Sequence, residues 1–167
     1  VLPNAELAEK ADLKTGNGIL VDGNCLTNDP DIVAAGDCTS HFNAFYDRQL
    51  RLECVQNAMD QAKAAAATLC GKPNQYNALP WFWSDQFDLK LQIAGLSNDF
   101  DELVLRGDPE SGRKIAAFYY RSGKVIAVDA VNSPQEFMIG KQIISRELEV
   151  DKGKLSDPAV AMKSLIV

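Results

Sequence analysis

The sequence has no long hydrophobic run, no basic cluster and no glycine-rich phosphate loop. Its longest apolar stretches span only a few residues, as within residues 124–128, so no segment is long enough to cross a bilayer. A formal charge of −6 without clustered Lys or Arg argues against nucleic acid as a partner. GxGxxG, P-loop and Walker lysine motifs are all absent, so these residues hold no dinucleotide-type phosphate loop of their own.

Histidine and paired cysteines are scarce as well. The four cysteines lie far apart, with no CxxC motif and no neighbouring histidines, which argues against a zinc site. Separate free thiols are typical of a reducing compartment, so we predict a cytoplasmic protein. His41 is the single histidine, and no Ser, Cys or carboxylate motif accompanies it. We expect it to be a loop residue rather than a catalytic base.

What is present is the composition of a folded protein. Of the 167 residues, 46% are hydrophobic and 24% charged, which excludes disorder and fits one domain or two small ones. Composition changes after Pro73, and the polar, turn-rich segment 74–80 is a candidate linker. We therefore predict two domains, at residues 1–76 and 77–167. Since the chain opens on Val1 and not on Met, we expect it to derive from something longer.

The first domain is predicted to contain several short elements before one long helix. Asn4 is a good N-cap for a helix that ends near Leu13. Residues 19–24 predict a short strand and a tight reversal, and hence a small hairpin. Residues 32–35 predict a buried strand, and residues 38–50 are expected to be irregular.

The long helix is predicted to begin near Arg51 and to end at Gly71 and Pro73, a C′ glycine and a helix breaker. Apolar residues recur along it at helical spacing and predict its buried face: Leu52, Val55, Ala58 or Met59, Ala62, Ala66 and Leu69.

The second domain is predicted to contain strands followed by helices. The strands are expected in four places: residues 81–83, 90–94 and 102–106, and a hairpin over 113–131 that turns at Gly123. Two helices are expected after them: one from Ser133 or Pro134, and one from Asp157 and Pro158 to Leu165. This order predicts an α+β class, with an antiparallel sheet and helices on one face.

Gly36 and Asp37 are the first candidate binding residues. They follow the predicted buried strand, and open α/β sheets present ligand contacts at the carboxyl ends of their strands. A carboxylate only accepts hydrogen bonds, so a sugar or polyol hydroxyl is a natural partner for Asp37. The alternative is that Asp37 merely caps a loop.

Aromatic side chains are concentrated in residues 81–86, Trp-Phe-Trp-Ser-Asp-Gln. In an extended segment Trp81 and Trp83 point to one side and Phe82 to the other. One interpretation is an aromatic wall beside a flat cofactor, and the other is a packing contact between domains. Glu53 suits the first turn of the long helix, where the helix dipole favours a carboxylate. A helix amino terminus can equally face a ligand with partial negative charge.

Several of these segments together resemble one protein family. Residues 27–37 (Thr-Asn-Asp-Pro-Asp-Ile-Val-Ala-Ala-Gly-Asp) are similar to the second FAD fingerprint of two-dinucleotide-domain flavoprotein reductases. Residues 51–58 (Arg-Leu-Glu-Cys-Val-Gln-Asn-Ala) and 80–86 (Pro-Trp-Phe-Trp-Ser-Asp-Gln) resemble FAD-dependent ferredoxin and rubredoxin reductases of the pyridine nucleotide-disulfide type. These putidaredoxin reductase-like proteins feed electrons to oxygenases. The opening residues 2–8 are similar to the family's exit from its NAD domain, so the resemblance covers essentially the whole chain.

The resemblance implies FAD as cofactor, NAD(P)H as hydride donor, and a 2Fe-2S ferredoxin or rubredoxin as electron acceptor. It also implies that a partial α/β FAD-binding domain precedes the predicted α+β domain, and it leaves a homodimer open. Asp37, after the turn at Gly36, would bind the ribityl or pyrophosphate region of FAD. The other implied contacts concern the flavin ring and the nicotinamide: Val55 at the pyrimidine edge of the isoalloxazine, Trp83 with Trp81 near the ring, and Glu53 on the nicotinamide side.

The departures from the family pattern are informative too. Both glycine-rich dinucleotide folds are missing, so the chain is expected to be the C-terminal part of a reductase and to be inactive alone. Cys54 and Val55 stand where some dioxygenase reductases have Ser-Trp. Two alternatives remain: an apoptosis-inducing-factor-like flavoprotein that responds to NADH, and a non-catalytic oligomerisation or docking module with the aromatic residues as anchors.

Overall fold

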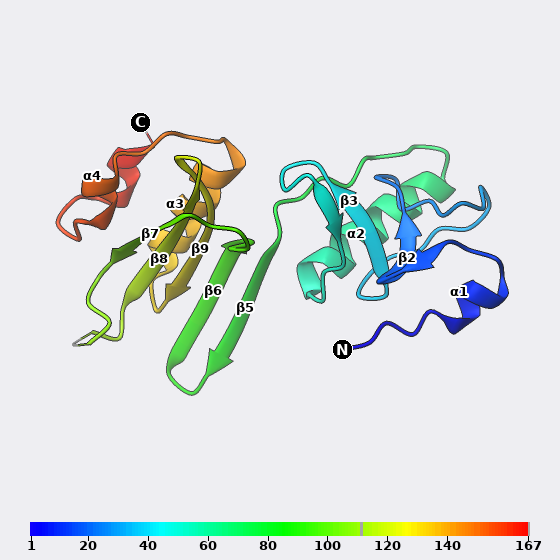
Figure 1. Ribbon diagram of the computed structural model, residues 1–167, viewed down its shortest axis with the longest axis horizontal. Helices are drawn as coiled ribbons and strands as arrows, with labels where there is room; N and C mark the ends of the chain where they lie inside the picture. The colour runs from blue at the N-terminus through cyan, green and yellow to red at the C-terminus, as the bar shows by residue number, and fades with distance from the viewer. Residues whose placement is uncertain (111, 167) are drawn as a thin grey trace. The chain divides into compact units, whose positions relative to one another are not determined.

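The computed structural model describes residues 1–110 and 112–166 (Figure 1). The chain divides into two compact units, Val1–Ala78 and a second unit from Leu79 onward. We call them the N-terminal unit and the C-terminal unit and describe each by itself. Within the described residues, no helix combines the length and the apolar character needed to cross a membrane.

The N-terminal unit is a small mixed sheet accompanied by one long helix. Its strands follow the order β1-β2-β3-β4, with β2 and β3 parallel and the other neighbours antiparallel. Its elements are, in chain order, α1 (Glu6–Lys10), β1 (Thr15–Gly16), β2 (Gly18–Val21), β3 (Thr39–Asn43), β4 (Arg48–Leu50) and α2 (Val55–Leu69). The predicted partial α/β domain is confirmed in this form.

Several local predictions for this unit are wrong. Helix α1 is preceded by Ala5 rather than Asn4 as its N-cap. The antiparallel pair is β1 with β2, so the hairpin reverses before Gly18. The predicted reversal after Val21 is confirmed, since the Cys25 amide donates to the Asp22 carbonyl at 3.0 Å, but the next strand, β3, pairs with β2 in parallel and forms no hairpin. Residues 38–50 contain β3 and β4, and His41 lies buried within β3 and not in a loop. The strands were missed because buried polar residues replace the usual apolar alternation: β3 buries Thr39, Ser40, His41 and Asn43.

Residues 32–35 do not form the predicted buried strand. Only Val33 makes an isolated bridge, to Leu26, and the four residues are half-buried. The backbone here bonds across a local loop instead, with the Thr27 amide donating to the Ile32 carbonyl at 3.0 Å. This short apolar run therefore forms part of a loop, because its backbone N–H and C=O groups bond to nearby residues of the chain and not to a neighbouring strand.

Helix α2 buries a different face from the one predicted. Val55, Met59 and Leu69 are 54%, 55% and 67% exposed, so the predicted apolar face is largely a surface. The buried residues are amides and alanines: Gln56, Asn57, Gln61, Ala64 and Ala65. The alanines pack with Cys25 and Tyr76 in a small core. The end of the helix is confirmed, since Gly71 adopts a positive φ of 69° just after the Cys70 cap.

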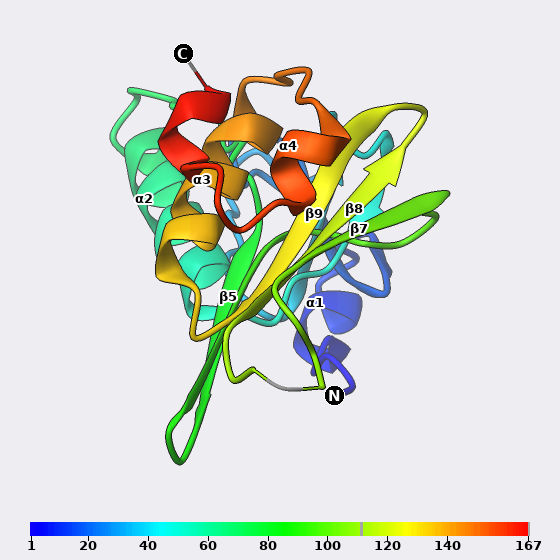
Figure 2. The same ribbon diagram turned by 90° about the vertical axis from the view of Figure 1, so that its left-hand side faces the viewer.

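The C-terminal unit is a five-stranded antiparallel sheet with its helices on one face (Figure 2). The strand order is β5-β6-β9-β8-β7. Its elements are β5 (Trp81–Gln86), β6 (Leu89–Gly95), β7 (Glu102–Arg106), β8 (Ile115–Arg121), β9 (Lys124–Val131), α3 (Pro134–Ser145), α4 (Lys152–Ser156) and the 3₁₀ helix η1 (Met162–Leu165). The predicted α+β arrangement is confirmed.

The core of this unit follows from strand alternation. On β8, Ala116, Phe118 and Tyr120 are buried toward the helices, while the residues between them are half-buried on the other face. Helix α3 approaches the sheet closely at Gly140, where an added Cβ would lie 2.7 Å from a methyl group of Val128. Only glycine permits this approach without displacing the strand.

The last predicted helix, residues 157–165, is wrong. Asp157 ends α4, and its carboxylate accepts a hydrogen bond from the Ala159 amide at 2.8 Å to form a turn. Helical structure resumes only in η1. Asp-Pro is a good helix start, but an aspartate that caps a turn has the same signature.

Candidate functional site

The Gly36–Asp37 turn lies immediately before β3, so Asp37 does not follow a strand as predicted. Gly36 is buried with φ at 90°, a conformation that glycine adopts at little cost. The Asp37 side chain is exposed. The turn therefore exposes the Asp37 carboxylate to solvent, while the backbone at Gly36 is buried.

Arg51 connects this turn to the segment that enters α2. Its Nη1 donates to the Asp37 carbonyl at 3.1 Å and pairs with the Glu53 carboxylate at 2.6 Å. Its Nε donates to the Asn17 side chain at 2.9 Å. One guanidinium thus fixes Asp37 and Glu53 relative to each other, as a planar fork of donors can. Its hydrogen bond to the carboxylate is the main cause that lowers the pKa of Glu53.

A shallow pocket of about 150 Å³ lies beside these residues. Residues 1–4 form one part of its lining, and Asp37, Cys38, Arg51 and Glu53 form the other. Val55 begins α2 and is more than half exposed, and the Cys54 sulfur before it lies beside the backbone amides of Gln56 and Asn57. The positive end of the helix dipole at this turn favours a ligand with negative charge.

A buried network of amides supports the turn from behind. The Gln61 carboxamide oxygen accepts hydrogen bonds from the Gly36 amide and the Thr39 hydroxyl, both at 2.7 Å. Its Nε2 lies 3.3 Å from Nδ1 of His41. Asn57 bonds to Gln61 and to the hydroxyl of Tyr76. The network joins the turn, β3 and α2 through side chains alone.

In the C-terminal unit, β5 presents Trp81 and Trp83 on the same face, as predicted. Their rings stack with centroids 5.3 Å apart. Trp81 also contacts Phe137 of α3, and the Lys141 ammonium lies 5.0 Å from the centre of its ring. Trp83 keeps 41% of its surface exposed. Trp81 is thus fixed by the core, and Trp83 extends the aromatic surface toward solvent.

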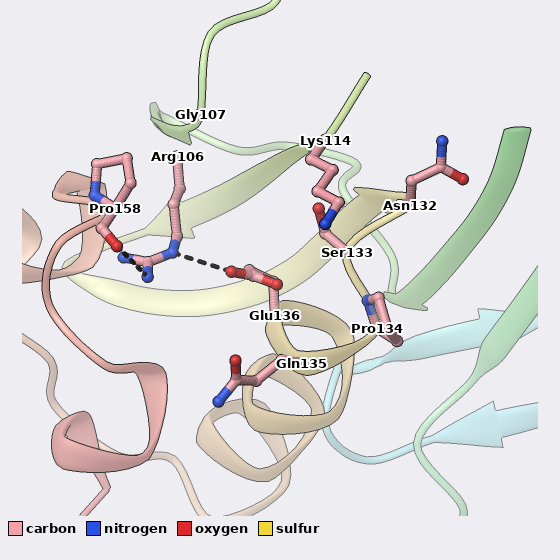
Figure 3. A pocket seen from close by; sticks show the side chains of 9 residues that line it. All are labelled: Arg106, Gly107, Lys114, Asn132, Ser133, Pro134, Gln135, Glu136 and Pro158. Carbon is pink, nitrogen blue, oxygen red and sulfur yellow. Dashed lines mark hydrogen bonds and ion pairs between the residues drawn. The ribbon is translucent and has the colours of Figure 1, made fainter. Parts of the chain in front are cut away.

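The C-terminal unit also has a pocket of about 390 Å³ at the start of α3 (Figure 3). The most buried charge beside it is Arg106, and its hydrogen bonds already go to protein groups. Those partners are the Glu136 carboxylate and the carbonyls of Leu155, Asp157, Pro158 and Val160. Arg106 therefore holds the last segment of the chain against the sheet, and no residue predicted for the site lies here.

The candidate residues fall into two groups. Gly36, Asp37, Glu53 and Val55 belong to the N-terminal unit, where Arg51 links Asp37 to Glu53, whereas Trp81 and Trp83 belong to the C-terminal unit. No group of three or more His, Cys, Asp or Glu residues suited to a metal occurs in the described ranges.

Sequence reasoning gave no role to Arg51 or Gln61. The spacing of Asn57 and Gln61 places both amides on one face of the predicted helix, but it does not identify their partners.

Comparison with known protein families shows which family the chain belongs to. The family described as "Reductase C-terminal" matches residues 81–166, and "Pyridine nucleotide-disulphide oxidoreductase" matches residues 1–62. The chain belongs to the pyridine nucleotide-disulphide oxidoreductases that carry this C-terminal reductase domain. The predicted resemblance is confirmed, and this reductase family includes proteins similar to the chain over nearly its whole length.

Two curated members of the reductase family illustrate the similarity. The chain is 48% identical to "Probable ferredoxin reductase CtmF" of Castellaniella defragrans, over 100% of the chain and 41% of that protein. It is 43% identical to putidaredoxin reductase CamA of Pseudomonas putida, over 99% of the chain and 39% of that protein. The chain thus spans about two-fifths of the length of the curated relatives it matches.

A solved member of the reductase family has the same fold. In the crystal structure of the covalent putidaredoxin reductase–putidaredoxin complex, one chain superposes with a TM-score of 0.92 at 43% identity, covering 99% of this chain and 39% of that one. The ferredoxin reductase for the CYP199A2 system of Rhodopseudomonas palustris superposes with a TM-score of 0.91 at 41% identity, covering 98% and 40%. Homology to ferredoxin reductases is therefore established in sequence and in fold.

Proposed function

We propose that this chain forms part of an NAD(P)H-dependent FAD reductase that passes electrons to a ferredoxin or rubredoxin serving an oxygenase. The observation that carries the proposal is that the two family matches together include both candidate groups, the Asp37 turn and the tryptophan strand. Relatives at 40% identity or more are named as a ferredoxin–NAD(P)(+) reductase and as the ferredoxin–NAD(+) reductase component of an anthranilate 1,2-dioxygenase system. By itself, the chain is expected not to turn over.

The N-terminal unit fits a flavin nucleotide on its own geometry. Gly36 allows the backbone to turn, and an added Cβ there would enter the space toward Ala58 of α2. Asp37 offers an exposed acceptor for ribityl hydroxyls, and its backbone is held by Arg51. The first turn of α2, at Val55, brings the positive end of the helix dipole to a group with negative charge. Acceptors for hydroxyls and a positive helix end for an anionic edge are what FAD requires.

In this proposal each residue binds or orients, and none performs covalent chemistry. Asp37 holds the ribityl or pyrophosphate region of FAD, the α2 amino terminus stabilises negative charge on the pyrimidine side, and Glu53 contacts the nicotinamide side. When bound, FAD would supply the chemistry of hydride acceptance from NAD(P)H and of single-electron transfer.

The tryptophans are proposed to contact the flavin and the electron-accepting partner. Their stacking on a rigid strand supports this role, because an aromatic surface anchored by Phe137 and Lys141 needs little ordering on binding. Trp83, which is the more exposed of the two, is the proposed contact residue. Trp81 is proposed to hold it in place.

The test uses the whole protein with NADH or NADPH, a 2Fe-2S ferredoxin or a rubredoxin, and cytochrome c as final acceptor. We expect a yellow protein whose cytochrome c reduction depends on the added iron–sulfur or rubredoxin partner. A yellow protein that shows no partner-dependent reduction contradicts the proposal.

Two readouts separate the alternatives. Slow turnover with a long-lived charge-transfer absorbance after NADH would indicate an apoptosis-inducing-factor-like protein instead. In the Trp83→Ala variant, a changed mass by light scattering would indicate a docking or oligomerisation role. An unchanged mass with altered flavin reduction kinetics supports the reductase.

A further inference from the structure

The amide network beneath the Asp37 turn has a consequence for how this turn is held. We propose that Gln61 is a positioning residue: its carboxamide fixes the Gly36–Asp37 turn against helix α2 in the geometry that receives FAD. The inference rests on the proposed function, because it assigns the support of the same binding turn. It concerns a residue that does not touch the ligand and acts through the backbone of Gly36.

The first observation is the fully buried place of Gln61. It has no exposed surface, and it lies on α2 six residues after Val55. A buried amide is costly unless its oxygen and nitrogen both find partners. The oxygen accepts from the Gly36 amide at 2.7 Å, the Thr39 hydroxyl at 2.7 Å and the Asn57 amide at 3.3 Å. Gln61 thus contacts both sides of Asp37 in sequence.

The second observation is that the direction of the Gln61 amide is determined. Its oxygen must face the Gly36 N–H, because that group can only donate. Its Nε2 then faces His41 Nδ1 at 3.3 Å, and this ring nitrogen must accept. His41 is buried, and burial lowers its pKa, which agrees with a neutral ring. The Gly36 N–H therefore fixes the direction of the Gln61 amide, and His41 takes the tautomer in which Nδ1 accepts.

The third observation is that the Gly36 amide lies outside any sheet ladder. It donates to the side chain of Gln61 instead. The carbonyls on this turn are bound by other groups: the Thr39 amide donates to the Gly36 carbonyl at 3.0 Å, and Arg51 donates to the Asp37 carbonyl at 3.1 Å. Gln61 is therefore the group that bonds the amide side of the turn to helix α2.

The experiment compares the whole protein with Gln61→Met and Thr68→Val variants. Methionine keeps the length of the side chain and removes both hydrogen-bonding functions. Thr68 is the matched control: its hydroxyl donates to the Asn24 carbonyl at 2.7 Å, so it joins the other end of α2 to a different loop. Thr68→Val removes one hydrogen bond between the same helix and a loop, and it does not alter the contacts of the Asp37 turn.

Two readouts are measured: the dissociation constant of FAD from quenching of its fluorescence on binding to apoprotein, and hydrogen–deuterium exchange of peptides covering residues 33–40. Gln61→Met is expected to raise the dissociation constant of FAD about tenfold or more and to speed exchange in these peptides. This is the size of effect expected when one or two hydrogen bonds are lost. Thr68→Val is expected to change the dissociation constant less than about twofold. Gln61→Glu keeps an acceptor for the Gly36 amide and should recover most of the exchange protection.

The outcomes separate the two claims. Wild-type protein without affinity for FAD contradicts the proposed function. Wild-type protein that binds FAD, together with a Gln61→Met variant that binds it as tightly as Thr68→Val does, overturns the positioning role alone. If Gln61→Met does not fold, wild-type exchange still decides: a Gly36 amide that exchanges as fast as an exposed loop amide overturns the inference.

Discussion

The two units of this chain are stabilised in different ways. In the C-terminal unit the large, fully buried side chains are apolar or aromatic: Phe118, Tyr120, Val128, Ile143, Ile144, Leu155 and Met162. In the N-terminal unit the corresponding residues are polar or small: Cys25, Thr39, Asn57 and Gln61. The first core is stabilised by removing apolar area from water and the second by directional hydrogen bonds.

This difference matches the tasks proposed for the two units. A core of hydrogen-bonded amides fixes the position of a backbone turn, which the proposed binding site for FAD requires, and each of its hydrogen bonds contributes about 1 kcal/mol to the free energy of unfolding. The N-terminal unit also exposes Val55, Met59 and Leu69 along α2. An apolar core packed from a sheet and two helices supplies the stability that the tryptophan strand needs. We therefore expect the C-terminal unit to unfold at higher urea concentration than the N-terminal unit.

The largest expected effect is a cavity in the C-terminal unit. Phe118→Ala removes a ring with no exposed surface beneath α3, and we expect it to lower the free energy of unfolding by about 3–5 kcal/mol. Both tryptophans of the chain lie in this unit, so their fluorescence in urea reports on it alone. If the fluorescence midpoint does not move, the apolar core is not what stabilises this unit.

The next effect concerns Arg106 and the last segment of the chain. Arg106→Met leaves the Glu136 carboxylate and several carbonyls without their donor, and we expect a loss of about 3 kcal/mol. Arg113→Met is the control, because Arg113 pairs with Asp88 at the surface and its loss should cost less than about 1 kcal/mol. Urea unfolding followed by tryptophan fluorescence measures both variants. Equal losses would mean that burial of the ion pair has no influence.

A smaller effect is a pH dependence of the N-terminal unit. Burial lowers the pKa of His41 below its usual 6.5, so between pH 6.5 and the folded pKa the unfolded state binds more protons than the folded one. The free energy of unfolding therefore falls as pH drops below 6.5, by up to about 1.4 kcal/mol per pH unit. Hydrogen exchange of the α2 amides at pH 7.5 and pH 5.5 measures the change. The His41→Gln variant should lose this dependence, and its persistence there would assign it to another group.

The sequence predicted the C-terminal unit well and the N-terminal unit less well, for the same physical reason. Strand alternation on β8, the apolar run of β9 and the apolar positions of α3 all reflect burial of apolar area, which hydrophobic patterns detect. In β3 and α2 the buried positions carry Thr, Ser, His, Asn and Gln, so hydropathy pointed to loops and to the wrong helix face. The turn at Asp157 was missed because an N-cap and a turn aspartate share one pattern.

The candidate binding residues remain predictions, Asp37 from its position and from the resemblance and Val55 from the resemblance alone. The same-side placement of Trp81 and Trp83, expected from strand geometry, is confirmed. The roles of Arg51 and Gln61 depend on contacts between residues that are 14 and 25 positions apart in the chain. Such contacts follow from the tertiary fold and not from local pattern, so the sequence alone could not assign them.

The most direct test of the account is the FAD dissociation constant of the whole protein with and without the Asp37 carboxylate. Asp37→Asn keeps the shape of the side chain and removes its charge, and Asp31→Asn, at another exposed aspartate of the same unit, is the matched control. We predict that Asp37→Asn raises the dissociation constant by about 10- to 100-fold, as expected for a charge-assisted hydrogen bond, and that Asp31→Asn leaves it within about twofold. Equal FAD affinity in the wild type and both variants would contradict the account.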